Sequence, residues 1–397
     1  MKRLGNIWND VINVDLAVRD IVDGTKYKRG KHEVKKLLYD KDVVAEHPEL
    51  WHQIDKAKAK EYAEYLIAML EDGTWIHQRP KHRQQYCRNK THGKGKWRKL
   101  SIPYLDDHII AHMVIRASMK ALTGGIHPHS CGSVPTRGIK HIYKTVKRWM
   151  QGDKECRYFV KLDIRHFFEN ITSDLLKAEL RKRIKDEKVL HVFDQIIDSD
   201  DSACPVGYYT SPWLANLLLQ DLDWFIEQQL YKERRGKRIK YVRHYLRYVD
   251  DMLLIGTCKG DMVKAIHEIQ KFLKNHYNLE IKNSWEIKAI GKHEIVDGEW
   301  NLKPGTYWCD IGGYKFCKDS VIMRDGIYLG TKRLAKKMHK KGYYTLHECR
   351  SINSRIGWAK HCNSNNFIRN DIEPYIDINK TRKVVSTCGV SRETANQ

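Results

Sequence analysis

The feature that most constrains this chain is a pair of adjacent acidic residues between two apolar segments. Asp250 and Asp251 follow His244–Tyr248 and precede Met252–Gly256, and both segments have the length and composition of buried strands. The pattern predicts a β-hairpin with both acids at its tip. A hairpin turn alone would favour Asn-Gly or Asp-Gly, so the two carboxylates indicate a divalent cation that relieves their repulsion. A solvated turn is the alternative for such a pair taken by itself.

A third acid ends another strand-like segment. Asp163 is the last residue of Tyr158–Asp163, 87 residues before Asp250. If these segments form adjacent strands, Asp163 and Asp250 meet at one end of a sheet. Mg²⁺ prefers oxygen ligands, and two such ions would activate a 3′-hydroxyl and hold a triphosphate during phosphoryl transfer. The sequence therefore predicts a metal-dependent catalytic site at these acids.

The charge balance points to a polyanionic partner. The chain has 72 Lys and Arg against 49 Asp and Glu, a formal net charge of +23. Such an excess favours nucleic acid over an anionic membrane surface, because no basic amphipathic helix stands out. Lys232–His244 and Lys332–Lys341 concentrate the charge in turn-rich or helical segments. Both could contact phosphates independently of base sequence, and a solvated surface is the alternative for each.

Neither membrane insertion nor secretion is expected. Apolar runs such as Tyr65–Leu70 are far shorter than the roughly 18–20 residues of a bilayer span, and the N-terminus lacks an apolar signal region. The ten cysteines are scattered without C-x-x-C or zinc-finger spacing, which favours reduced thiols. We therefore expect a cytoplasmic protein without a membrane partner.

The order of helical and strand-like segments predicts an α+β fold. They alternate without the regular order of a parallel sheet. Helical periodicity appears in 32–72, 106–122, from about 173, in 210–229, 262–275 and from about 332. Strand-like segments lie at 158–163, 241–256, near 280–290 and at 307–318, and residues 91–103 indicate a basic hairpin.

Six blocks along the chain resemble, in the same order, a prokaryotic reverse transcriptase related to the group II intron enzymes. They are Gly95–Pro103 with Asp106-Asp107-His108, Ser130–Gly138, Lys161–Phe168, Pro205–Asn216, Tyr248–Asp251 and Gly357–His361. A single Y-x-D-D motif is weak evidence, whereas six blocks in family order are specific. The likeness covers roughly residues 85–370.

The resemblance implies a right-hand polymerase, with fingers, a palm of antiparallel sheet plus helices, and a helical thumb. It predicts a helical N-terminal extension over 1–80, fingers over 81–155, a palm with some fingers elements over 156–320, and a helical thumb and C-terminal tail over 321–397. The extension exceeds what a minimal polymerase needs and is a candidate binding region for a dedicated RNA or a second protein.

The resemblance also implies roles for single residues. Asp163, Asp250 and Asp251 would be the catalytic ligands of two Mg²⁺ ions, for which Mn²⁺ could substitute. Phe168, five residues after Asp163, would act as a steric gate against a ribose 2′-hydroxyl, with Phe167 as the alternative. Further dNTP-binding candidates are Arg98, Lys96, Gly207 and Lys282, the last in competition with Lys288. Template and primer contacts are expected from Tyr248, Pro212, Asn216, Lys332, Arg333, Lys336 and Lys337.

The expected function is RNA-directed DNA synthesis from dNTPs on a dedicated RNA template, in antiphage defence. Only about 27 residues follow residue 370, so no RNase H, HNH or maturase domain is expected, which leaves retron-type, diversity-generating and defence-associated enzymes. Val206 replaces the Gln of group II enzymes, as an apolar residue does in diversity-generating enzymes, so a low-fidelity enzyme is one alternative. A template-independent or protein-primed nucleotidyltransferase is another.

Two rivals fit the residues less well. An RNA polymerase would need room for the 2′-hydroxyl at Phe168, and an inactive binding module would not need the intact acids Asp163, Asp250 and Asp251. The expected partners are an RNA template, the DNA product and dNTPs, and an oligomer stays open.

Overall fold

A five-stranded sheet forms the centre of the molecule. The structure is a computed structural model that describes residues 3–26, 28, 31–39, 54–88, 95–296 and 299–393. The strand order is β3-β7-β8-β4-β9. The strands are β3 (Ser130–Cys131), β4 (Tyr158–Asp163), β7 (His244–Tyr248), β8 (Asp251–Gly256) and β9 (Lys288–Ala289). Only β3 and β7 pair in parallel; the other pairs are antiparallel.

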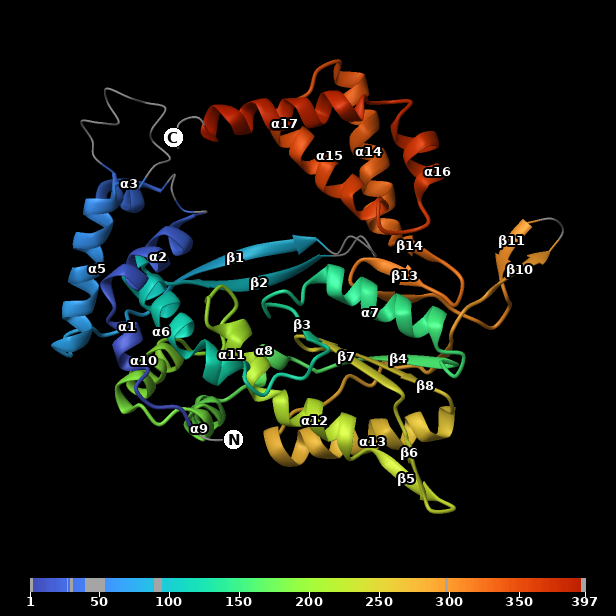
Figure 1. The fold of residues 1–397 in the computed structure, drawn as a ribbon, viewed down its shortest axis with the longest axis horizontal. Coiled ribbons are helices and arrows are strands. Elements are labelled where there is room, and N and C mark those ends of the chain that lie inside the picture. Colours follow the sequence, from blue (N-terminus) through green and yellow to red (C-terminus); the bar gives the residue numbers. More distant parts are fainter. Residues whose placement is uncertain are drawn as a thin grey trace.

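Both faces of this sheet are covered, because the strand residues alternate between two apolar clusters. Val160, Leu162 and Leu254 belong to the larger cluster, which includes helix α13 (Lys259–Tyr277) and helix α12 (Gln220–Gln228). Phe159, Leu253 and Ile255 belong to a second cluster with α7 (Ile139–Gly152). Figure 1 shows α7 on one side of the sheet and α12 and α13 on the other.

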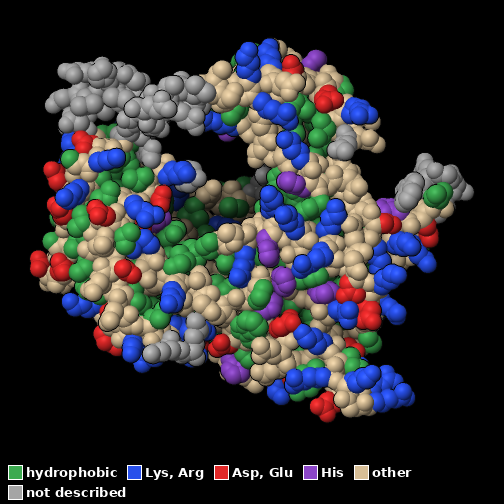
Figure 2. Space-filling model, viewed as in Figure 1, with side chains coloured by type: hydrophobic (Ala, Val, Ile, Leu, Met, Phe, Trp, Pro, Cys, Tyr) green, Lys and Arg blue, Asp and Glu red, His purple; other side chains and the backbone are tan. Residues whose placement is uncertain are grey.

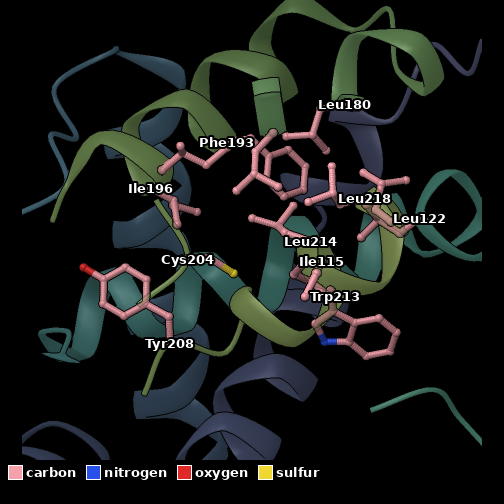
Figure 3. Packing of buried hydrophobic residues seen from close by; sticks show 14 of the residues in the cluster. Ile115, Leu122, Leu180, Phe193, Ile196, Cys204, Tyr208, Trp213, Leu214 and Leu218 are labelled. Atoms are coloured by element: carbon pink, nitrogen blue, oxygen red, sulfur yellow. The ribbon is translucent and has the colours of Figure 1, made fainter. Parts of the chain in front are cut away.

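A helical layer extends the larger cluster away from the sheet. It contains α6 (Leu105–Thr123), α8 (Phe167–Asn170), α9 (Ser173–Arg183), α10 (Glu187–Asp198) and α11 (Ser211–Leu218). Figure 3 shows how side chains from these helices interlock: Ile115, Leu180, Phe193, Leu214 and Leu218 meet in one core. The N-terminal helices α1 (Trp8–Val11), α2 (Val14–Thr25), α3 (His32–Leu38) and α5 (Lys56–Glu71) pack on this layer.

The C-terminal part has its own apolar core. A small sheet of β12 (Cys309–Ile311), β13 (Tyr314–Phe316) and β14 (Val321–Met323) leads into α14 (Asp325–Lys341), α15 (Leu346–Ala359), α16 (Asn365–Phe367), the π-helix Ile368–Ile372 and α17 (Ile378–Glu393). A third apolar cluster joins these helices. A capping box between Thr345 and Glu348 starts α15.

Three two-stranded hairpins project from these layers. They are β1 (Lys81–Arg88) with β2 (Gly95–Ile102), β5 (Tyr231–Arg234) with β6 (Lys237–Lys240), and β10 (His293–Val296) with β11 (Glu299–Leu302). Figure 1 shows β5–β6 and β10–β11 extending away from the body. The basic hairpin expected near residues 91–103 is therefore present, although its tip, 89–94, lies outside the described residues.

The α+β prediction is confirmed, with three local corrections and one choice between the expected turn-rich and helical alternatives. The helix expected over 210–229 is two helices that meet at Leu219. The expected strand near 280–290 is reduced to β9 and an isolated bridge at Ile281. The C-terminal helices begin at Asp325 rather than near Lys332. The basic stretch from Lys232 is a hairpin followed by the start of β7.

The helix expected over 32–72 has two described parts, α3 and α5, and residues 40–53 between them lie outside the described residues. In the described ranges, no helix combines the length and the apolar character that a membrane span requires.

Candidate active site

Three carboxylates meet at one end of the central sheet. Asp163, the last residue of β4, stands opposite Asp251, the first residue of β8, in their antiparallel register. Asp250 precedes Asp251 in the turn between β7 and β8. Burial and the charges of Asp251 and Asp163 raise the pKa of Asp250 to about 6. Desolvation also raises the pKa of Asp251, and the charge of Asp163 adds to this effect. The trio therefore carries negative charge that its surroundings only partly offset.

The arrangement fits a divalent cation. Lys282 Nζ donates to Asp163 Oδ2 at 2.7 Å, but Asp163 Oδ1 is buried and has no hydrogen-bond partner in the described part of the chain. A buried carboxylate oxygen without a partner is unfavourable, and Mg²⁺ takes oxygen ligands of this kind. Lys288 pairs instead with Glu286, so Lys282 is the lysine at this site.

The turn that presents the acids has a fixed and unusual backbone. Val249 has φ +58, in the left-handed region that a β-branched residue rarely adopts. Its N–H donates to Cys131 O at 3.2 Å, and Arg247 Nη1 donates to Val249 O at 2.8 Å. Gly132 has φ +85, and a Cβ there would lie 2.8 Å from Val249 Cγ2. Only glycine allows this close approach, which explains the Ser-Cys-Gly segment beside the hairpin.

A fully buried ion pair between Arg247 and Asp223 stabilises this turn. Arg247 donates to both oxygens of Asp223, each at 2.7 Å, and neither side chain is exposed. Tyr245 OH and Ser130 Oγ also donate to Asp223, at 2.8 and 2.6 Å. The polar groups are thus satisfied, as a buried network requires. Sequence reasoning missed Asp223 and Arg247; the available signal was a charged residue inside the apolar segment His244–Tyr248.

Asn216 belongs to the same network. Its side chain is fully buried, its Nδ2 donates to Gly132 O at 2.8 Å, and its Oδ1 accepts from Arg247 Nη1 at 3.0 Å. The expected contact of Asn216 with template or primer does not fit this burial. The residue instead links the turn to α11, so we assign it a positioning role.

Gly207 joins the α10–α11 loop to strand β2. Ser101 N donates to Val206 O at 2.9 Å, and a Cβ at Gly207, where φ is +119, would collide with Ser101 O. Lys99 and Ser101 bond to Asp201 and Asp200. Lys96 and Arg98 occupy the alternate positions of β2, are exposed and lie on its other face.

Phe167 and Phe168 have different surroundings. Phe167 is buried in the core at 3% exposure, whereas Phe168 is half-buried, and their rings meet edge to face at 5.2 Å. Of the two rings, Phe168 is therefore the one that a ligand can reach. Its role as a steric gate stays a prediction.

A comparison with protein families decides which class of protein has this arrangement. The family described as "Reverse transcriptase (RNA-dependent DNA polymerase)" matches residues 80–284, just over half of the chain. The chain belongs to the reverse transcriptase family. The predicted resemblance and the right-hand polymerase class are thereby confirmed.

This member of the family is similar to three curated bacterial proteins. It is 26% identical to Protein YkfC of Escherichia coli K12, over 44% of this chain and 54% of that protein. It is 24% identical to the Retron Ec73 reverse transcriptase of Escherichia coli, over 59% and 68%. It is 30% identical to the Group II intron-encoded protein LtrA of Lactococcus lactis, over 43% and 29%. The chain thus spans about half of YkfC and less than a third of LtrA.

The residues expected to contact template and primer are spread over this reverse transcriptase. Tyr248, at the end of β7, is 37% exposed, and Pro212 is half-buried in the first turn of α11. On α14, Lys332 is paired with Asp371, whereas Arg333, Lys336 and Lys337 are exposed. Figure 2 shows a hollow between the C-terminal helices and the rest of the molecule, with Lys and Arg side chains on the surfaces beside it.

Proposed function

We propose that this chain is an RNA-directed DNA polymerase that adds dNTPs to a 3′-hydroxyl with two Mg²⁺ ions. The observation that carries the proposal is Asp163 Oδ1, which is buried among three carboxylates at the β4–β8 end of the sheet and accepts no hydrogen bond from the described residues. Asp163, Asp250 and Asp251 would hold the ions, and Mn²⁺ would be accepted. The ions supply charge that favours the 3′-alkoxide and the leaving pyrophosphate.

The other residues of the site position the nucleotide. Arg98 and Lys96, exposed on β2, would bind the triphosphate, and Arg98 can do so in a bidentate manner. Lys282 is 2.7 Å from Asp163 Oδ2, which would place its ammonium proton beside the leaving pyrophosphate. Phe168 would exclude a ribose 2′-hydroxyl, and Gly207 would keep the loop before α11 against β2.

We assign fingers to 81–155, palm to 156–320 and thumb to 321–397, with Arg333, Lys336 and Lys337 of α14 and Tyr248 and Pro212 on the template–primer side.

The template is proposed to be a dedicated RNA in antiphage defence, in a cytoplasmic setting. The match to the retron enzyme covers 59% of this chain and the match to LtrA covers 43%, which favours a retron-like role. Residues 1–80 would bind that RNA or a second protein.

The test is extension of a DNA primer on RNA with Mg²⁺ and dNTPs. The Asp250→Asn/Asp251→Asn variant should lose at least 10³-fold in rate, since oxyanion and metal interactions in such sites contribute several kcal/mol. Asp174→Asn, an exposed acid of α9, is the matched control and should keep full activity.

A folding readout separates lost chemistry from lost structure. Because the pKa of Asp250 is raised to about 6, its charge is unfavourable in the folded protein at pH 7. The double variant should therefore melt no lower than the wild type in the absence of metal. Equal synthesis by both proteins would refute the proposal, and RNase-resistant synthesis without added RNA would favour template-independent addition.

Sugar selection is a second prediction. Phe168→Ala should raise incorporation of ribonucleotides relative to deoxynucleotides by at least tenfold, because the gate is removed. Phe167→Ala is the control: it should cost about 3–5 kcal/mol of stability by opening a cavity, without changed sugar selection. The assay measures both nucleotides in competition, and a larger ribonucleotide gain in Phe167→Ala would reverse the assignment.

A further inference from the structure

Three potential metal ligands converge at the root of the β10–β11 hairpin, outside the site described above. His293 begins β10, and Cys317 and Asp319 lie in the turn between β13 and β14. Cys317 Sγ lies 3.7 Å from His293 Nδ1 and 3.0 Å from Asp319 Oδ1, and His293 Nδ1 lies 2.7 Å from Asp319 Oδ1. Thiolate, imidazole and carboxylate groups are each ligands that zinc takes in proteins.

The spacing is close to that of a tetrahedral zinc site. Zn–S and Zn–N bonds of about 2.3 and 2.0 Å at the tetrahedral angle separate S and N by about 3.5 Å, and here they are 3.7 Å apart. Asp319 Oδ1 would have to withdraw by roughly half an ångström from its present position. Its side chain is 29% exposed, so it has room to withdraw, whereas Cys317 is fully buried.

The backbone already holds the two ligand segments together. His293 N donates to Asp319 Oδ2 at 2.8 Å, and Lys318 N donates to Gly291 O at 2.8 Å. The Trp308 ring meets the His293 ring edge to face at 5.3 Å. The donors are thus preorganised, which lowers the ordering cost of binding an ion.

A second cluster of similar composition provides a contrast. Asp153, Cys156 and His244 also have ligand atoms within 4.8 Å of one another. There, however, Asp153 Oδ2 accepts from Arg243 Nε at 2.5 Å, so a permanent cation already neutralises the carboxylate. Within the described residues, Asp319 has no ion pair with Lys or Arg; its charged partner is His293. The His293 cluster is therefore the better cation site.

We propose that His293, Cys317 and Asp319 bind one Zn²⁺ ion, with the fourth position taken by water. On binding, the thiol proton leaves to solvent and the imidazole keeps its proton on Nε2, so that one thiolate and one carboxylate balance the charge of the ion. The ion would tie the β10–β11 hairpin to the β13–β14 turn. Because β14 leads directly into α14, this link would restrict the movement of the first C-terminal helix relative to the small sheet. This proposal is independent of the polymerase function.

The test uses the full chain and the metal alone. Protein purified without chelators, loaded with Zn²⁺ and then dialysed against zinc-free buffer with excess Mg²⁺ to occupy the three carboxylates, should retain one zinc per chain, and Cys317→Ser should lower zinc affinity by more than tenfold. Co²⁺-loaded wild type should show a thiolate–Co²⁺ charge-transfer band that is absent from Cys317→Ser. Cys156→Ser, in the contrasting cluster, should keep both the zinc and the band.

Two results would overturn the proposal. One is wild-type protein that retains no zinc after dialysis; the other is a Co²⁺ band that survives in Cys317→Ser or disappears in Cys156→Ser. If Cys317→Ser fails to fold, His293→Gln replaces it, since that side chain is partly exposed at 15%. His293→Gln should also lose the zinc, and unchanged zinc content in that variant would count against the site.

Discussion

Two consecutive hairpins of this chain differ in burial and in charge: the first is exposed and basic, and the second is buried with acids at its tip. The basic hairpin, β5–β6, has six Lys or Arg residues between 232 and 240, and its strands are largely exposed. The β7–β8 hairpin, which we term the catalytic hairpin for its proposed role, is buried along most of both strands and carries its acids at the tip. Figure 1 shows the first projecting from the body and the second inside the central sheet.

The turns of the two hairpins are also held differently. In the basic hairpin, Arg235 and Gly236 both have positive φ, +51 and +70, as a two-residue turn requires, and a Cβ at Gly236 would meet nothing. In the catalytic hairpin, Val249 is bonded to Cys131 of β3 and to Arg247 of β7, and it packs against Gly132, which follows β3. Local turn chemistry is enough to present charge, whereas bringing Asp250 and Asp251 beside Asp163 depends on tertiary support. We therefore expect the catalytic hairpin to be sensitive to geometry and the basic hairpin to respond only to charge.

The largest expected effect tests the buried support of the catalytic hairpin. Arg247→Met leaves Asp223 buried without its cation, which should cost about 3–5 kcal/mol in the free energy of unfolding. Arg243→Met, four residues earlier and 44% exposed, breaks the ion pairs with Asp153 and Glu155 and should cost about 1 kcal/mol or less. Chemical denaturation measures both. Equal losses in the free energy of unfolding would mean that the buried network stabilises the protein no more than an exposed ion pair does.

A smaller effect compares Gly132, which packs against the turn of the catalytic hairpin, with Gly236, which lies in the turn of the basic hairpin. Gly132→Ala and Gly236→Ala both place a side chain at positive φ, which costs about 1–2 kcal/mol each. Only Gly132→Ala also presses on Val249 Cγ2, so only this variant should lower primer extension, by at least tenfold. The primer-extension rate at saturating template distinguishes the two variants. A comparable loss of rate in Gly236→Ala would show that the basic hairpin also positions the active site.

The same contrast explains what the sequence could predict. The apolar segments around Asp163 and Asp250–Asp251 predicted two strands with acids at their ends, and the register of β4 and β8 brings those acids together. This worked because strand alternation is a local signal. The break at Leu219 and the irregular stretch after Glu280 follow instead from packing against neighbouring elements, which local periodicity does not report.

The support of the site could not be predicted in this way. Arg247 and Asp223 are 24 residues apart and lie on a strand and a helix, so their pairing appears only when α12 packs on β7. The resemblance likewise predicts a template or primer contact for Asn216, whereas the residue is fully buried and bonds to Gly132. Residues that contact a ligand can be recognised in the sequence by a motif. Residues that position those ligand-contacting residues show only as a polar side chain in an apolar segment.

The smallest expected effect concerns the basic hairpin. Lys232 and Lys240 are paired with Asp261 and Glu227, but Arg234, Arg235 and Lys237 at the tip are exposed. Changing these three to Gln should weaken RNA binding and reduce the dependence of log Kobs on log salt by roughly 1–3, because each lost phosphate contact removes about 0.7–0.9 from the slope.

Primer extension at saturating template should be unchanged in this variant, and stability should change by no more than about 0.5 kcal/mol. Changing the paired residue Lys240 to Gln is the control, and it should move the slope less than the triple variant. An unchanged slope in the triple variant would mean that the tip does not meet nucleic acid. A lowered primer-extension rate at saturating template would instead mean that the basic hairpin also affects the position of the acids in the catalytic hairpin. The two hairpins would then not have separate roles, one in binding and one in catalysis.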